Sequence, residues 1–178
     1  MDQVFAPWRI EWVERDGNED VDGCPFCVLP DREDAREANV LAESEHAAVI
    51  LNNFPYNPGH AMVVPHEHTE AYEALDRDVL LDHARLKQRT VEAFEAGLEP
   101  DGINAGLNLG NGSGGSIDGH LHTHMVPRWA GDTNFMPVTA DTKVIVEAVA
   151  DTYETLHAAF EAQAGATVAD SGAVHVEF

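Results

Sequence analysis

The sequence predicts an α+β domain in which one antiparallel sheet of about five strands carries two main helices. Two observations support this prediction. Short apolar segments occur in pairs joined by turn residues, and each pair is followed by a longer segment with helical spacing. The resulting order of hairpin, helix, hairpin, helix is typical of antiparallel α+β folds, in which strands are joined by short turns, and not of a doubly wound parallel sheet.

The first hairpin and helix occupy the middle of the chain. Residues 47–51 are a short apolar run, and residues 61–64 form the return strand. The asparagines, prolines and glycine of residues 52–59 predict a long polar turn between them. A helix is then predicted from a cap at Asp76 to Ala96, with apolar residues at helical spacing and a glycine at the stop position.

The second hairpin and helix follow in the same order. Residues 101–109 are predicted as a third strand and residues 119–126 as a fourth, which Pro127 ends. A second helix is predicted from a cap at Asp141 to its end at Gly165, again with an apolar stripe on one face.

We divide the chain into an N-terminal arm (1–45) that contains a Cys-x-x-Cys knuckle, a main domain (46–165) and a C-terminal tail or strand (166–178). No apolar run approaches the ~20 residues of a membrane span. The first residues lack the basic and apolar regions of a signal peptide. We therefore expect a soluble protein of the cytoplasm with no membrane partner.

The charge balance is strongly acidic, with 32 Asp and Glu against 10 Lys and Arg and a net charge of −22. Such a surface repels nucleic acid and anionic membranes. It is typical of proteins that work in concentrated salt, where the Debye length falls to ~3 Å, so we interpret the protein as halophilic; the alternative is an acidic mesophilic protein. A phosphate ligand would have to be bound by histidines, loop amides and a few arginines such as Arg9 and Arg128.

The two cysteines form the motif Cys24-Pro25-Phe26-Cys27. Such a pair can be half of a zinc site, a redox pair or a coincidence. An acidic, glycine-containing loop (16–23) precedes it where a redox motif would follow a strand, which favours a metal knuckle. Because zinc usually takes four ligands, two histidines from elsewhere would have to complete the site.

Residues 120–124 read His-Leu-His-Thr-His and follow a glycine-rich run over residues 110–116. On a β-strand, residues two apart share a face at roughly 6–7 Å, so the three imidazoles would lie on one face. Imidazoles can bind metal or act as nucleophiles and acid–base groups near neutral pH. The loop amides suit a phosphate, so the pair of motifs favours phosphoryl or nucleotidyl chemistry over a zinc strand or a chance cluster.

Residues 51–65, which include Phe-Pro-Tyr-Asn-Pro-Gly-His, and residues 120–127 together resemble the histidine triad (HIT) family of nucleotide hydrolases and transferases. Residues 6–9, the cysteine motif and residues 126–136 resemble its branch of diadenosine tetraphosphate phosphorylases and related nucleotidyltransferases. The resemblance implies a HIT-like fold over residues 46–165. It also implies a homodimer whose sheets join and a nucleotide or dinucleoside polyphosphate as substrate.

The resemblance also implies catalytic roles. His122 matches the nucleophile, which attacks the α-phosphate and forms a nucleotidyl-histidine before transfer to water or phosphate. His60 matches the histidine that orients this nucleophile through its other ring nitrogen, alone or together with a backbone carbonyl. Donors to the phosphoryl oxygens are implied at His124, Ser116 and the amides around Gly114 and Gly115. The spacer between Ser116 and the triad is longer than in many members, which leaves the placement of that serine open.

Nucleotide contacts are implied at three further positions. Asn52 matches the residue that touches the ribose, with Asn53 as the rival for that register. Asn108 matches a polar position near the phosphate or leaving group, and Trp129 is assigned to close over the site.

Zinc-containing members of the family imply a structural zinc site, without an organic cofactor. The implied ligands are Cys24, Cys27, His68 and His120. His66 is the rival for His68, and an unligated, reduced cysteine pair is the alternative.

The acceptor, water or phosphate, stays open at this stage, as do two other functions: a zinc-containing nucleotide-binding regulatory module and a nucleoside phosphoramidate hydrolase. A metal-dependent phosphatase is a weaker alternative. Among the remaining histidines, His83 lies on the apolar side of the first helix and is expected to be a packed residue.

Overall fold

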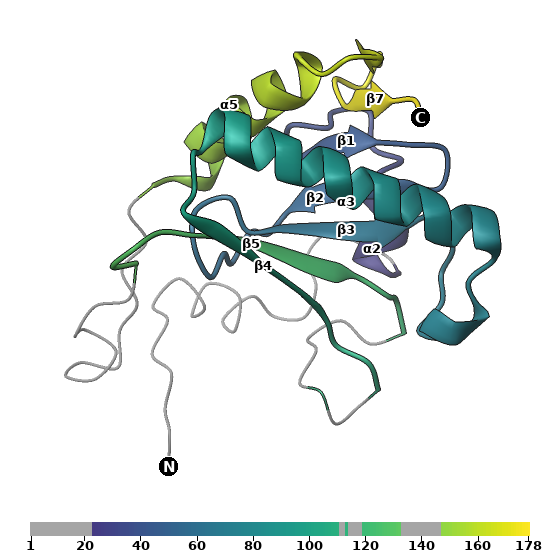
Figure 1. The fold of residues 1–178 in the computed structure, drawn as a ribbon. Coiled ribbons are helices and arrows are strands. Elements are labelled where there is room, and N and C mark those ends of the chain that lie inside the picture. Colours follow the sequence, from purple (N-terminus) through teal and green to yellow (C-terminus); the bar gives the residue numbers. More distant parts are fainter. Residues whose placement is uncertain (1–22, 111–112, 114–118, 133–146) are drawn as a thin grey trace.

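The computed structural model describes residues 23–110, 113, 119–132 and 147–178. Its strands form one seven-stranded sheet in the order β4-β5-β3-β2-β1-β7-β6 (Figure 1). The strands are β1 (Val40–Glu43), β2 (Ala47–Leu51), β3 (Ala61–Pro65), β4 (Gly102–Leu107), β5 (Thr123–Arg128), β6 (Ala166–Val168) and β7 (Val174–Val176). The helices are α2 (Pro25–Val28), α3 (Arg77–Gly97) and α5 (Val149–Glu161), with a 3-10 turn η1 (Tyr72–Ala74).

The expected α+β architecture is confirmed. The hairpins β2–β3 and β4–β5 lie in one sheet, because β3 pairs antiparallel with β5. The expected strand number and pure antiparallel pairing are wrong: the sheet has seven strands, and β1 runs parallel to β7. The added strands are β1, which was not expected, and β6 and β7, which lie in residues 166–178, where a tail or a strand was expected. Each has only three or four residues, too few to show an alternating pattern in the sequence.

The start of the first predicted helix agrees with the structure, whereas α5 begins later than the second helix was predicted to begin. α3 begins directly after Asp76, as expected, and extends through Gly97. α5 begins at Val149, because Ala148, its N-cap residue, is extended (φ −70°, ψ 144°). The predicted cap Asp141 lies outside the described residues.

β5 starts later and ends later than expected. It begins at Thr123 instead of residue 119 and continues through Pro127 to Arg128. β3 pairs only with residues 123–125 of β5, so at Pro127 the strand has a partner on one side only, which is β4. A proline is tolerated at such a position.

Both faces of the central strands are covered, which explains why β2 and β3 are apolar at every position. One face packs against α3 and α5 through fully buried side chains such as Phe94 and Phe160. The other packs against the segment 24–38, which includes α2 and Phe26 (Figure 1). No helix within the described residues is long and apolar enough to cross a membrane.

His83 is a packed residue, as predicted. It is fully buried on α3, and its Nε2 donates to the carbonyl of Val63 at 3.1 Å, with the Thr123 hydroxyl at 3.3 Å. Burial lowers the pKa of His83. The side chain therefore ties α3 to the point where β3 and β5 pair, since Val63 and Thr123 are partners in that ladder.

The turn between β2 and β3 delivers His60 to the first position before β3. The amide of His60 donates to the carbonyl of Asn57 at 3.1 Å, and the amide of Asn52 donates to the carbonyl of His60 at 2.8 Å. Gly59 adopts φ +78°, which favours glycine. A Cβ at this position would meet the Leu98 side chain and lie 3.0 Å from the rigid ring of Pro127.

We predict that Gly59→Ala destabilises the protein more than Gly172→Ala does. Both glycines have positive φ (78° and 90°), but a Cβ at Gly172 meets nothing within 4 Å. The shared backbone cost is about 1–2 kcal/mol, and crowding against Pro127 should add about 1–3 kcal/mol at Gly59 only. Denaturant unfolding of the two variants measures the difference, and equal losses would contradict the crowding argument.

Candidate active site

The three histidines of residues 120–124 do not lie together on one strand, so that expectation is wrong. Only His124 belongs to β5; His120 and His122 precede it. The physical reason is local: Gly119 adopts φ +81°, and the amide of Leu121 donates to the carbonyl of Thr69 at 2.7 Å instead of to a neighbouring strand. The three rings consequently take different partners.

His122 is held in one tautomer by its own backbone neighbourhood. Its Nδ1 lies 2.9 Å from the carbonyl oxygen of His120, and its side chain is buried. A carbonyl can only accept, so Nδ1 carries the proton and the neutral ring keeps its lone pair on Nε2. Of the two orienting groups that the resemblance implied, His60 and a backbone carbonyl, the carbonyl makes the contact at His122 Nδ1. The arrangement suits a nucleophile.

His60 contacts the third histidine instead. The amide of Tyr56 donates to His60 Nδ1 at 3.1 Å, and His60 Nε2 lies 2.9 Å from His124 Nδ1. Because the amide can only donate, His60 carries its proton on Nε2 and donates it to His124. His124 then carries its proton on Nε2, which lies 3.4 Å from the side-chain nitrogen of Asn108. That nitrogen is itself a donor, so Asn108 accepts from His124 only when its amide turns the oxygen toward Nε2. This histidine chain ends in an N–H donor.

Burial, with a smaller electrostatic effect of the neighbouring His122, lowers the pKa of His124 to about 4. His124 is therefore neutral at pH 7, which agrees with its role as acceptor at Nδ1 and donor at Nε2. The rings of His122 and His124 are in edge contact, with centroids 4.9 Å apart. A lone pair on His122 and a donor on His124 thus lie side by side, as attack on a phosphoryl group requires.

The two asparagines at the start of the turn differ in their surroundings. Asn52 contacts Met62 Sδ through Nδ2 at 3.7 Å, and Met62 is the cross-strand partner of His124. Asn53 accepts a hydrogen bond of 2.7 Å from Asn39, an exposed contact. The geometry favours Asn52 over Asn53 as the ribose contact.

Three predicted phosphate-binding residues, Ser116, Gly114 and Gly115, lie outside the described residues. Trp129 follows the carboxyl end of β5, the end away from His122. No contact recorded for the described residues joins it to the histidines.

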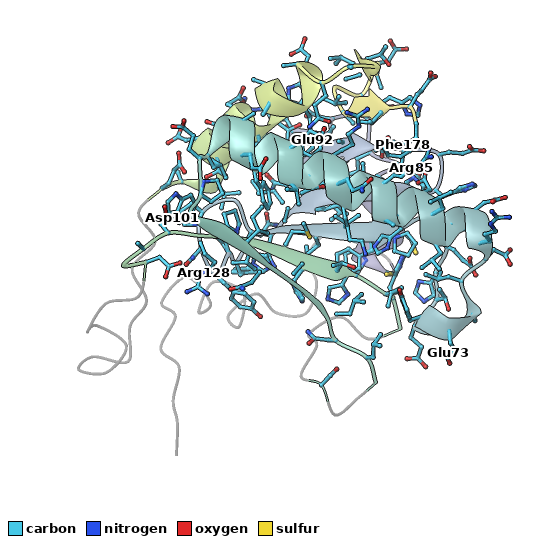
Figure 2. All side chains as sticks on the ribbon, viewed as in Figure 1. Glu73, Arg85, Glu92, Asp101, Arg128 and Phe178 are labelled. Atoms are coloured by element: carbon cyan, nitrogen blue, oxygen red, sulfur yellow. The ribbon has the colours of Figure 1, made fainter. Side chains whose placement is uncertain are left out.

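Arg128, expected to help bind phosphate, is engaged elsewhere. Its guanidinium makes two hydrogen bonds to Asp132, at 2.5 and 2.9 Å, and one to Asn104 at 2.7 Å. This bidentate pair holds the pKa of Asp132 far below its usual range. Figure 2 shows Arg128 beside Asp101 at one end of the sheet, and the amide of Ala130 donates to Asp101 there. The arginine fastens the end of β5, so the expectation of phosphate binding is not met.

The predicted metal ligands come together. The ligand atoms of Cys24, Cys27, His68 and His120 all lie within 4.8 Å of one another; we call these four residues the metal cluster. Cys24 Sγ lies 3.3 Å from His120 Nδ1, and Cys27 Sγ lies 3.2 Å from His68 Nδ1. In a tetrahedral zinc site with ordinary bond lengths the S···N edges would be about 3.6 Å.

The tautomer of His120 fits a metal ligand as well. Its Nε2 donates to the carbonyl of Pro65 at 2.8 Å, which leaves the Nδ1 lone pair toward the cysteines. Burial lowers the pKa of His120, so the ring is neutral and can ligate. His66, the rival ligand, instead has its Nε2 3.4 Å from the carbonyl of Ser44 and is not part of the metal cluster.

Two aromatic residues of the site were missed in the sequence. Tyr56 is 56% exposed and stacks on His60, with centroids 4.6 Å apart and planes at 19°. Phe26 is buried and contacts the rings of both His120 and His122. The only sequence signal for these contacts was that Tyr56 lies in the turn motif before His60 and that Phe26 lies between the two cysteines.

Comparison with known proteins decides the family. The model of the HIT domain matches residues 33–131. The chain belongs to the HIT family. An AP-4-A phosphorylase of Mycobacterium tuberculosis is 35% identical to this HIT chain over 162 residues, which cover 88% of this chain and 83% of the relative.

Solved structures confirm the HIT fold. A histidine triad nucleotide-binding protein of Sulfolobus tokodaii, described as hypothetical, matches with a TM-score of 0.62 and 27% identity over 78% of this chain and 92% of that one. A Zn-bound histidine triad family protein of Mycobacterium smegmatis matches with a TM-score of 0.61 and 26% identity over 78% and 93%.

We predict that His124 makes stability depend on pH between about 6.5 and 4. The unfolded histidine, with a pKa of about 6.5, takes up a proton as the pH falls, whereas folded His124 resists protonation until about pH 4. The free energy of unfolding should therefore fall through this window. His124→Asn should show a shallower fall, measured by denaturant unfolding at each pH.

Asn108→Ala is the matched control, because it changes the neighbour of His124 without removing a titrating group. It should keep the wild-type slope. A wild-type slope in His124→Asn would show that this histidine does not carry the effect.

Proposed function

We propose that this HIT protein acts on the α-phosphate of nucleoside or dinucleoside polyphosphates through a nucleotidyl-His122 intermediate. The chain is a HIT-type enzyme, in agreement with its family match and the enzyme name of its 35% identical relative. The observation that carries the proposal is the 2.9 Å bond from His122 Nδ1 to the carbonyl of His120, which leaves the Nε2 lone pair available.

In the first step, His122 Nε2 attacks the α-phosphorus. A P–N bond forms, the P–O bond to the rest of the polyphosphate breaks, and the leaving oxygen departs with that electron pair. The neutral His124 can donate from Nε2 to a phosphoryl oxygen, since its Nδ1 is occupied by His60. Dividing the displacement into two steps lowers each barrier, and a fixed donor stabilises the developing charge.

In the second step, an acceptor oxygen attacks the same phosphorus and the P–N electrons return to Nε2. From diadenosine tetraphosphate, loss of ATP leaves AMP on His122; transfer to phosphate then gives ADP, and transfer to water gives AMP. The name of the mycobacterial relative favours phosphate as the acceptor, so we propose a diadenosine tetraphosphate phosphorylase.

We predict that the wild type converts diadenosine tetraphosphate to ATP and ADP only when phosphate is present. After brief mixing with α-labelled nucleotide and quenching, the wild type should carry covalent label. His122→Ala should lose the label and at least about a thousandfold in rate, as expected when a covalent nucleophile is removed. Product chromatography and denaturing gels measure both.

His46→Ala, a histidine outside the site, should retain label and rate. AMP with ATP in water alone would make the protein a hydrolase. If only nucleoside phosphoramidates are turned over, the protein is a nucleoside phosphoramidate hydrolase. Nucleotide binding without turnover would favour a regulatory module. Label retained in His122→Ala would refute the assignment of the nucleophile.

We further propose that the metal cluster holds a structural zinc ion. Two thiolates and two neutral imidazoles suit zinc, and the Zn-bound structural neighbour supports the assignment. The site would fasten the segment that begins at Cys24 to His120, just ahead of β5. Two cysteines kept as a ligand pair also suit a reducing compartment, which supports a cytoplasmic protein.

We predict about one zinc ion per chain in the purified protein. Cys27→Ala and His68→Ala should each lower the zinc content and the thermal midpoint, because a three-ligand site binds more weakly. His66→Ala should keep both, as His66 lies outside the metal cluster. Elemental analysis measures zinc; full zinc in Cys27→Ala, or loss in His66→Ala, would contradict the assignment.

We also propose that the protein is halophilic, as its net charge of −22 indicates.

We further propose that the protein forms a homodimer through β4. This strand lies at the edge of the sheet and is exposed along most of its length, with small residues such as Gly102, Ala105 and Gly106. An uncovered edge strand can pair with a second copy.

We predict that KM for a polyphosphate falls as salt rises from about 0.1 M toward 1 M, where the Debye length shrinks from ~10 to ~3 Å. The reason is that a chain of net charge −22 repels a polyanionic substrate until the repulsion is screened. Steady-state kinetics in KCl measures the trend. A KM that rises with salt, as for a positively charged site, would contradict this explanation.

A further inference from the structure

Phe26 connects the metal cluster to the proposed nucleophile. It lies between Cys24 and Cys27 on α2, and only 2% of its surface is exposed. It belongs to the buried cluster on the sheet face opposite α3 and α5, together with Ile50 and Val64. Its position is therefore fixed both by the packing of that face and by the two cysteines that flank it.

The phenyl ring contacts two histidines of different function. Its centroid lies 4.9 Å from that of His122, at an interplanar angle of 48°. It lies 5.5 Å from that of the metal ligand His120, in an edge-on contact at 83°. Phe26 is thus the residue of the knuckle that touches the ring proposed to attack the phosphate.

His122 needs such a contact because the sheet does not hold its backbone. It precedes β5, whose first ladder partners are at Thr123. Its ring is held by one hydrogen bond at Nδ1 and by contacts with Phe26 and His124. If Phe26 moves, the ring can rotate away from the carbonyl of His120, and the single tautomer is lost.

We propose that Phe26 is a positioning residue for His122, and that the metal cluster acts on the active site by holding Phe26 against this imidazole. Ligation of Cys24 and Cys27 fastens both ends of the segment that carries the phenyl ring. The metal would then set the orientation of His122 Nε2 without touching substrate. The activity part of this proposal rests on the proposed function; the orientation of the ring does not.

The experiment compares zinc-loaded Phe26→Ala and Phe26→Leu with Leu29→Ala. Leu29 packs against the same buried cluster, so its variant reports general loosening of that face. Nitrogen NMR of the histidine side chains, with the His122 signal assigned from His122→Ala, reads the tautomer directly. Zinc content, nucleotide Kd and kcat are measured on the same samples.

We expect Phe26→Ala to convert His122 from one Nδ1–H tautomer to a mixture and to lower kcat roughly tenfold to a hundredfold, as for a displaced catalytic group. Kd and zinc content should stay near the wild type. The tautomer mixture and kcat of Phe26→Leu should lie between those of the wild type and those of Phe26→Ala. Leu29→Ala should keep the wild-type tautomer and kcat.

An unchanged His122 tautomer in both Phe26 variants overturns the proposal, as does an equal change in Leu29→Ala. If Phe26→Ala does not fold, Phe26→Leu decides by the same signals. Chelation of the wild type should reproduce the tautomer mixture while the fold is retained; an unchanged signal would break the link to the metal. A wild type that forms no nucleotidyl-histidine but shows the tautomer effect would refute the proposed function alone.

Discussion

The hydrogen bond from His122 Nδ1 to the carbonyl of His120, 2.9 Å long, is the contact on which the chemistry of this fold depends. It assigns the lone pair to Nε2 without any charged partner. The carbonyl is itself well fixed, because the ring of His120 donates to Pro65 at the end of β3 and turns its other nitrogen toward the cysteines. The sheet, the metal cluster and the proposed nucleophile are therefore joined through His120.

In the proposed function, neutral groups of this strongly acidic chain bind the phosphate. The histidine chain from Tyr56 through His60 to His124 is set by a backbone amide at one end and ends in an N–H donor at the other. Burial keeps His124 neutral, with its pKa lowered to about 4. Arg128, the described arginine expected near the phosphate, instead pairs with Asp132. Among the residues that the structure describes, oriented dipoles and not cations surround His122, which suits a protein whose net charge is −22.

Much of this could be predicted from the sequence. The two hairpins, α3 and the four residues of the metal cluster follow from apolar patterning and from the resemblance. The partner of each histidine could not be predicted, because it depends on β5 beginning at Thr123, which is decided by Gly119 and by the Leu121–Thr69 bond. The contact of Phe26 with His122 could not be predicted either, because a single buried phenylalanine in a short motif gives no repeating pattern. Strand β1 was too short to show one, and residues 166–178, which contain β6 and β7, could be assigned only as a tail or a strand.

Phosphoryl transfer through His122 in two displacements leaves a record in the stereochemical course at the α-phosphorus. That course is measured with a substrate made chiral at this phosphorus by sulfur substitution and analysed in the nucleotide product. Two successive in-line displacements predict overall retention of configuration. Inversion would mean a single displacement by water or phosphate, and His122 would then not be the nucleophile.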